Sequence, residues 1–158
     1  MKITKNKNDL EFKCQDVSYN EGLKISKKLK QVVLFGNNKN CVGLAHNQIK
    51  GNKNVFIAKI NNKWITFINA TIIKKSDPKK VVESCMSFPN KFNNVNRFYN
   101  ITISHLKENN YIIEEFNGFN AQIIQHEIDH LNGIHIFNKN GVKNEKNKNK
   151  WYRRLLLY

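Results

Sequence analysis

Apolar residues recur along the chain at two different spacings, which predict both helices and strands. Between residues 21 and 35 they fall at helical intervals with lysines between them, which predicts a first helix. The middle of the chain instead has short apolar runs separated by polar turns, a pattern typical of strands. The predicted strands cover residues 55–60, 64–68, 71–74, 81–88, 95–105 and 111–116. We expect a turn at residues 76–78 and a strand end at Pro89.

A second helix is predicted late in the chain, over residues 118–131, with Asn132-Gly133 as its stop signal. Strands followed by one late helix favour an α+β fold over an alternating parallel one. We expect mixed or antiparallel strands packed around this central helix. The length of 158 residues fits one domain, which we place at residues 1–137, and a basic linker and tail at residues 138–158.

The chain is strongly basic, with a net charge of +15 from 27 Lys and Arg against 12 Asp and Glu. Such a balance favours anionic surroundings such as RNA. A Lys- and Asn-heavy coding bias, as in a phage or another AT-rich genome, explains the same composition equally well. Charge alone therefore does not choose between an RNA partner and no partner.

The three cysteines are an odd, sparse set that does not look like a disulfide framework. Residues 1–9 are charged and polar, without the apolar centre of a signal peptide. No apolar run approaches the ~20 residues needed to span a bilayer. We therefore expect a soluble, cytoplasmic protein without membrane contact, whose thiols stay reduced and can bind metal.

The second predicted helix carries a candidate metal motif. His126 and His130 are four residues apart, so both imidazoles point to one side of the helix and can hold a transition metal. Glu127 lies beside the first histidine, where it can accept a proton from a metal-activated water. This HExxH spacing predicts a metallohydrolase, although it also occurs by chance on solvated helix faces.

A third ligand decides the class of metal site. Downstream, His135 comes one residue too early for one zinc-protease layout, and Glu145 lies in the lysine-rich segment. Upstream, Cys85 would complete Cys-His-His coordination with a fourth position open for water. Taken alone, Cys85 is more simply explained as a buried core residue, so its neighbours must decide.

Three segments together strongly resemble the signatures of the peptide deformylase family, which are GxGLAxxQ, EGCLS and QHExDHLxG. The matching sequences are VGLAHNQ at residues 42–48, ESCMS at residues 83–87 and QHEIDHLNG at residues 125–133. They occur in the family's order, and the resemblance covers roughly residues 21–137. It implies a metal-dependent hydrolase that removes the N-formyl group from the N-terminal methionine of nascent polypeptides and releases formate.

By motif position, the resemblance implies roles for individual residues. The ligands of one divalent metal ion would be Cys85, His126 and His130. That ion would be Fe(II) in the cell, while Zn(II), Ni(II) or Co(II) could replace it in the purified protein. Glu127 would be the acid and base. The Gln48 side-chain amide and the Met86 backbone N–H would donate to the developing oxyanion.

Further residues are expected to contact the substrate or to support the metal ligands. The predicted substrate contacts are Val42, Gly43, Leu44, Phe119 and Ile123. Phe119 and Ile123 lie on roughly the metal-binding face of the helix and would line the methionine pocket, together with the polar Gln122, although simple core packing explains both apolar residues equally well. Glu83 and Arg97 are expected to pair behind the metal, or else to be independent surface charges.

Four residues depart from the family pattern, and they put substrate preference in doubt more than the reaction. They are Cys41, His46, Asn47 and Ser84. Ser84 replaces a glycine, so we expect its φ to be negative. His46 is expected at the surface or at the mouth of the cleft.

Two other classes of function remain open. One is a zinc endopeptidase, and the other is a catalytically silent metal-binding homologue that acts through its basic surface. If the protein is a deformylase, its expected partner is a formyl-methionyl nascent peptide. The expected oligomeric state is a monomer. Ribosome contact through the basic surface and residues 138–158 is a further expectation, since nascent chains emerge through anionic RNA.

Overall fold

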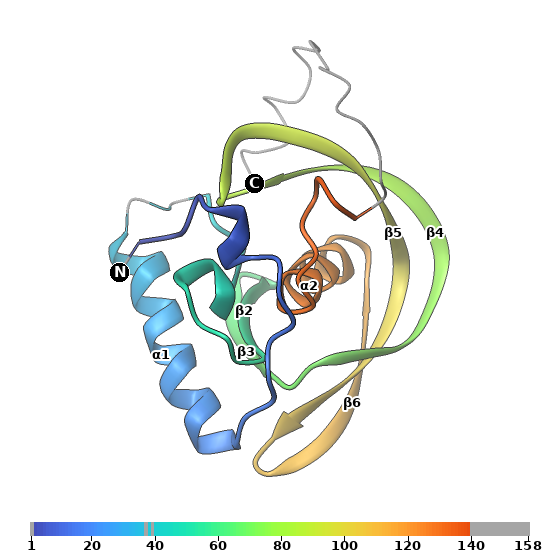
Figure 1. The fold of residues 1–158 in the computed structure, drawn as a ribbon. Coiled ribbons are helices and arrows are strands. Elements are labelled where there is room, and N and C mark those ends of the chain that lie inside the picture. The colour runs from blue at the N-terminus through green and yellow to red at the C-terminus, as the bar shows by residue number, and fades with distance from the viewer. Residues whose placement is uncertain (1, 37, 39, 140–158) are drawn as a thin grey trace.

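The computed structural model describes residues 2–36, 38 and 40–139. In this part of the chain, two antiparallel three-stranded sheets accompany two α-helices (Figure 1). The elements are η1 (Lys7–Asp9), α1 (Tyr19–Phe35), β1 (Gly43–Ala45), η2 (His46–Ile49), β2 (Val55–Ile60), β3 (Lys63–Ile68), β4 (Thr71–Cys85), β5 (Phe88–Lys107), β6 (Asn110–Asn117) and α2 (Gly118–Leu131). The predicted α+β fold is confirmed.

The strands are ordered β1-β2-β3 in one sheet and β4-β5-β6 in the other. Two-residue turns connect β2 to β3 and β5 to β6. Asn61 and Asn62 form the first turn, and Glu108 and Asn109 the second, all with positive φ. Two successive positive φ angles match the right-handed twist of a hairpin, and asparagine tolerates them better than most residues. These polar turns therefore fix the register of both hairpins.

Helix α2 occupies the centre of the molecule, with β4 and β5 curving around it (Figure 1). Its apolar residues Ala121, Ile124 and Ile128 are buried in a core shared with Phe56 of β2 and Ile103 of β5. The helix is thus held between the two sheets. This packing fixes which of its faces turns toward the end of β4.

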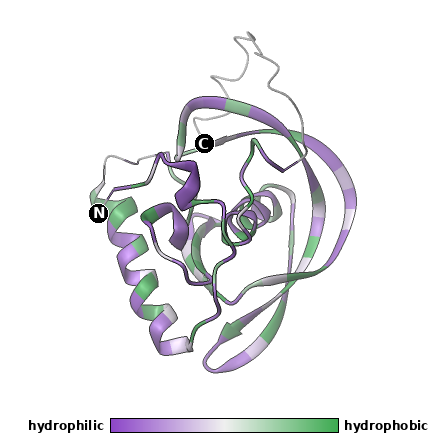
Figure 2. Cartoon of the chain, in the orientation of Figure 1, coloured by the Kyte–Doolittle hydropathy of each residue, from purple (hydrophilic) through white to green (hydrophobic). Residues whose placement is uncertain are grey.

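Helix α1 covers the other face of the β1-β2-β3 sheet. Figure 2 shows apolar and polar bands alternating along it, as expected for a helix with one buried face. Ile25 and Leu29 pack in a second core with Leu44, Ile57 and Ile68. Ser18 caps the helix by accepting a hydrogen bond from the Glu21 N–H.

The predicted turn at residues 76–78 and the predicted strand end at Pro89 are both wrong. Residues 71–85 form one strand, β4, which lies at the edge of its sheet, where a proline is tolerated. Asp77 has a positive φ of 57°, and the pairing register with β5 continues across it. Pro89 is the second residue of β5, at a register shift where Ser84 pairs with Phe92 and Cys85 with Phe88. A prolyl residue disrupts no ladder there.

No helix in the described ranges is long and apolar enough to cross a bilayer. Residues 140–158, which hold most of the predicted linker and tail, lie outside the described residues.

Candidate metal centre

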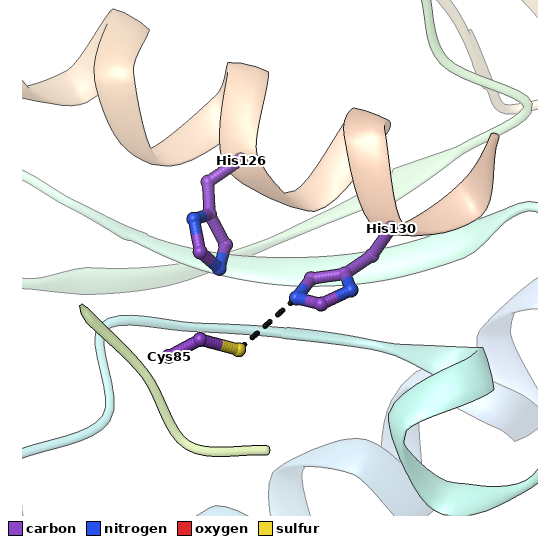
Figure 3. A group of neighbouring side chains, drawn as sticks. All are labelled: Cys85, His126 and His130. Carbon is purple, nitrogen blue, oxygen red and sulfur yellow. Dashed lines mark hydrogen bonds between the residues drawn. The ribbon is translucent and has the colours of Figure 1, made fainter. Parts of the chain in front are cut away.

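Three potential metal ligands from two elements meet in one place. Cys85 ends β4, while His126 and His130 project from successive turns of α2 toward it (Figure 3). One ligand atom from each residue lies within 4.8 Å of the others, and Cys85 Sγ is 3.2 Å from His130 Nε2. A thiolate and two imidazoles suit a transition metal such as iron or zinc, and this spacing is compatible with shared coordination. The residues therefore fit a metal ion.

Glu83 fixes the orientation of the His126 ring from the side opposite the other two candidate ligands. Its Nδ1 lies 2.9 Å from Glu83 Oε2, which leaves Nε2 for a metal. Arg97 donates to both oxygens of Glu83 at 2.7 Å, from Nε and from Nη2. The structure thus places the predicted Glu83–Arg97 pair in direct contact behind His126.

Electrostatics in this cluster follow from burial and from these contacts. Burial alone raises the pKa of Glu83, but hydrogen bonds from Arg97 and His126 outweigh it and lower that pKa to about 2. Burial likewise lowers the pKa of His126, yet contacts with Cys85 and Glu83 hold it well above its ordinary value. Glu83 is therefore an ionised carboxylate at neutral pH.

Glu127 is buried beside the ligands with one oxygen free. Its Oε2 has no hydrogen-bond partner among the residues that the structure describes. Burial raises its pKa to about 7, so the carboxyl group can exchange a proton near neutral pH. Gly43 of β1 makes room for it, because a Cβ at position 43 would lie 2.3 Å from Glu127 Oε1.

Gln48, on η2, extends its side chain toward the candidate metal ligand Cys85. Its Oε1 accepts a hydrogen bond from the Ala45 N–H at 2.9 Å, which orients the amide. Its Nε2 then points at Ser87 Oγ (3.3 Å) and Cys85 Sγ (3.6 Å). Met86 lies between these two residues in sequence, and its carbonyl accepts from Lys5 Nζ at 2.5 Å. An amide donor therefore stands next to the candidate metal ligands.

The predicted substrate contacts other than Gly43 lie in different environments. Phe119 is 59% exposed at the start of α2, whereas Ile123 is buried one turn later. Val42 is half-buried against the main core. The Leu44 side chain is fully buried between α1 and β2, so only its backbone can reach a ligand.

Two of the four departing residues take part in interactions that sequence reasoning missed. The Asn47 side-chain amide is buried and donates to the carbonyls of His130 and Leu10. It therefore ties η2 to the end of α2. The Cys41 thiol donates to the Gly43 carbonyl at 3.0 Å, and burial raises its pKa to about 12. No local sequence signal predicts these contacts, because all three acceptors are backbone carbonyls.

The other two departures are accommodated without strain. The His46 ring packs on Gly51 and its Nδ1 accepts from the Lys53 N–H at 3.3 Å. Ser84 is exposed, and its φ is not positive. A serine can therefore replace glycine there at no cost in backbone strain.

A cavity of about 860 Å³ lies on the opposite face of α2 and contains none of the three ligands. Its walls include Phe98, Gln125, Ile128 and Asp129. The candidate metal centre and this cavity are therefore separate features that share one helix.

Comparison with known proteins gives consistent matches to one family. The family described as Polypeptide deformylase matches residues 2–148. The peptide deformylase of Clostridium beijerinckii is 41% identical over 104 residues, which cover 65% of this chain and 76% of the relative. That of Pseudothermotoga lettingae is 37% identical over 95 residues, covering 59% of this chain and only 55% of the relative.

Comparison with solved structures gives matches to the same family. The peptide deformylase of Thermotoga maritima superposes with a TM-score of 0.74 at 28% identity, covering 83% of this chain and 90% of the other. A class I type b peptide deformylase from Acinetobacter baumannii gives a TM-score of 0.75 at 27% identity, with coverage of 85% and 94%. The similarity therefore extends over nearly the full length of those folds.

Proposed function

The chain belongs to the peptide deformylase family, and we propose that it removes the N-formyl group from the N-terminal methionine of nascent polypeptides and releases formate. Members of this family are metal-dependent hydrolases. The observation that carries the proposal is the convergence of Cys85, His126 and His130, with the buried Glu127 beside them.

Formamide hydrolysis needs an activated water, stabilisation of one oxygen and a proton for the leaving amine. A metal ion held by the Cys-His-His set would supply Lewis-acid activation of water and of the formyl oxygen. Glu127 accepts the water proton and passes it to the amine, two roles that suit a pKa of about 7. Gln48 Nε2 and the Met86 N–H donate to the developing oxyanion, contacts commonly worth about 3–4 kcal/mol each.

We propose that the peptide binds along β1. Within the described sheet, β1 pairs with β2 on one side alone, so its other edge can accept an extended chain. Those backbone groups of Val42, Gly43 and Leu44 that do not face β2 would form these hydrogen bonds, whereas the Val42 carbonyl faces β2 and accepts from the Lys59 N–H. The exposed Phe119, with Ile123 one turn later, would contact the methionine side chain. Support for this arrangement is the contact between Gly43 and Glu127, which brings the strand next to the base.

We further infer that the metal in the cell is Fe(II), on the strength of the family resemblance, and that Zn(II), Ni(II) or Co(II) can replace it in the purified protein. The mixed thiolate and imidazole set is compatible with all four. Metal analysis of protein purified anaerobically from its host would test this. Zinc alone in such a preparation would contradict the inference.

We also propose that the protein works as a monomer in the cytoplasm near the ribosome, where formylated chains emerge. The net charge of +15 favours contact with ribosomal RNA. Co-sedimentation with ribosomes at low salt would test this. Binding that does not weaken as salt rises would contradict an electrostatic contact.

A formate-release assay tests the proposed reaction. Protein loaded with Fe(II) under anaerobic conditions should release formate from a formyl-Met peptide and leave an acetyl-blocked peptide intact. Glu127→Gln should retain the metal and lose about 10²–10⁴-fold in turnover, the usual contribution of a general base. Cleavage at internal bonds would instead indicate an endopeptidase. Absence of any product from fully loaded protein would indicate a silent homologue.

A further inference from the structure

A continuous chain of charged side chains leads from His126 to the far side of α2. We call Glu83, Arg97, Asp129 and Lys139 the charge chain. Glu83 accepts from His126 and from Arg97, as described above. The remaining Arg97 nitrogen, Nη1, donates to Asp129 Oδ2. Lys139 Nζ in turn donates to both oxygens of Asp129, at 2.8 and 2.6 Å.

The charge chain is buried at its inner end and reaches solvent at its outer end. The side chains of Arg97 and Glu83 are 1% and 5% exposed, while those of Asp129 and Lys139 are 15% and 21% exposed. Two cations and two carboxylates alternate along it. A buried guanidinium needs its donors satisfied and its charge balanced. Glu83 alone cannot do both, because it also accepts from His126.

We propose that Asp129, held by Lys139, is a positioning residue for the metal ligand His126. Asp129 binds the Nη1 side of Arg97 and so fixes the rotation of the guanidinium that presents Nε and Nη2 to Glu83. It also takes up part of the Arg97 charge. Glu83 then remains free to accept from His126 Nδ1, and the other ring nitrogen stays directed toward Cys85 and His130.

This proposal rests on the proposed metal site. It predicts a change in metal affinity, which simple stabilisation of the fold does not. A structural ion pair would affect unfolding alone. A positioning pair must change how tightly the site holds metal, because a misoriented imidazole is a poorer ligand. Metal affinity of the folded protein is therefore the deciding quantity.

The experiment measures Co(II) affinity of the full-length protein by competition with a chromophoric chelator, together with the visible spectrum of the bound Co(II). Asp129→Asn should lower the affinity about 10-fold, the lower end of typical outer-contact effects. Lys139→Met should lower the Co(II) affinity less. Lys139→Arg should keep the parental affinity, because arginine retains the charge and the donors. In the formate assay at saturating metal, Asp129→Asn should lower kcat and leave KM unchanged.

Glu114→Gln is the matched control. It removes a carboxylate that contacts the buried His105 at 2.6 Å, away from the metal centre. It should change the melting temperature of metal-free protein without changing Co(II) affinity. If Asp129→Asn fails to fold, the Lys139 variants decide.

Parental Co(II) affinity and an unchanged spectrum in Asp129→Asn, or in Lys139→Met if the former is unfolded, would overturn the proposal. This outcome is distinct from failure of the proposed function. A parent protein that binds Co(II) but releases no formate would contradict deformylation, and the effect of Asp129 on affinity would still be measured.

Discussion

Gly43 shows how the site depends on the absence of a side chain. The residue lies in β1 opposite Ala58, and a Cβ there would come within 2.3 Å of Glu127 Oε1. Gly43→Ala should therefore displace the proposed base while leaving the metal ligands in place. Because a misplacement of about 1 Å can cost about 100-fold, we expect kcat to fall by about that factor. Formate-release kinetics and metal content of the same preparation provide the measurement.

Gly22→Ala serves as the control for this substitution. Its Cβ would crowd Ile68 between α1 and β3, at 2.5 Å, and so should reduce stability without touching the site. Equal kcat losses in the two variants would show that crowding acts through stability and not through Glu127.

At the residue scale, sequence reasoning could find groups whose chemistry is visible in local spacing. His126, Glu127 and His130 follow from a four-residue repeat on one helix, and Cys85 from its motif. Sequence reasoning could not predict the hydrogen bond from Asn47 to the His130 carbonyl, because the acceptor is a backbone group 83 residues away. It also could not supply the raised pKa of Glu127, which depends on burial by the whole fold.

At the element scale, Gln125 connects α2 to the middle of β5. Its amide accepts from the Phe98 N–H at 2.9 Å and donates to the Phe98 carbonyl at 2.8 Å. Gln125→Ala leaves both backbone groups without this partner, so unfolding free energy should fall by about 1–3 kcal/mol. Urea unfolding of metal-free protein measures the change.

A second variant on the same helix distinguishes the loss of the buried Gln125–Phe98 hydrogen bonds from the loss of any side-chain hydrogen bond. Asn120 donates to Asn61 at an exposed position, at 3.0 Å. Asn120→Ala should cost less than about 0.5 kcal/mol, as is usual at the surface. A Gln125→Ala loss no larger than this would mean that α2 is held in place by its apolar face alone.

The hairpin of β4 and β5 shows why element boundaries were partly mispredicted. Prolines break strands that are paired on both sides, and the sequence gives no sign that Pro78 lies on an edge strand. Pro89 is compatible with β5 because the register shifts there. Both facts are properties of the assembled sheet. The short hairpin turns at Asn61-Asn62 and Glu108-Asn109, by contrast, are local features, and both fall between strands that the apolar runs predicted.

At the scale of the whole molecule, the proposed metal centre joins parts of the chain that lie far apart in the sequence. Cys85 ends β4, His126 and His130 lie on α2, and Gln48 comes from the segment that follows β1. A bound ion would thus cross-link the β4-β5-β6 sheet to the central helix. Ligands that bind only the folded state stabilise it according to their concentration relative to Kd.

Metal binding should therefore raise the melting temperature of the entire domain in one transition. At a free metal concentration of 1,000 times Kd, the gain is about 4 kcal/mol. In a domain of this size, each kcal/mol shifts the melting temperature by roughly 2–4 °C, so we expect about 10 °C between chelator-treated and Ni(II)-loaded protein. Differential scanning calorimetry measures it. Cys85→Ser should lose most of the shift, because a neutral serine hydroxyl is a much weaker ligand for a transition metal than a thiolate. A full shift in Cys85→Ser would mean that the stabilising ion binds elsewhere, and the Cys-His-His centre would then have to be abandoned.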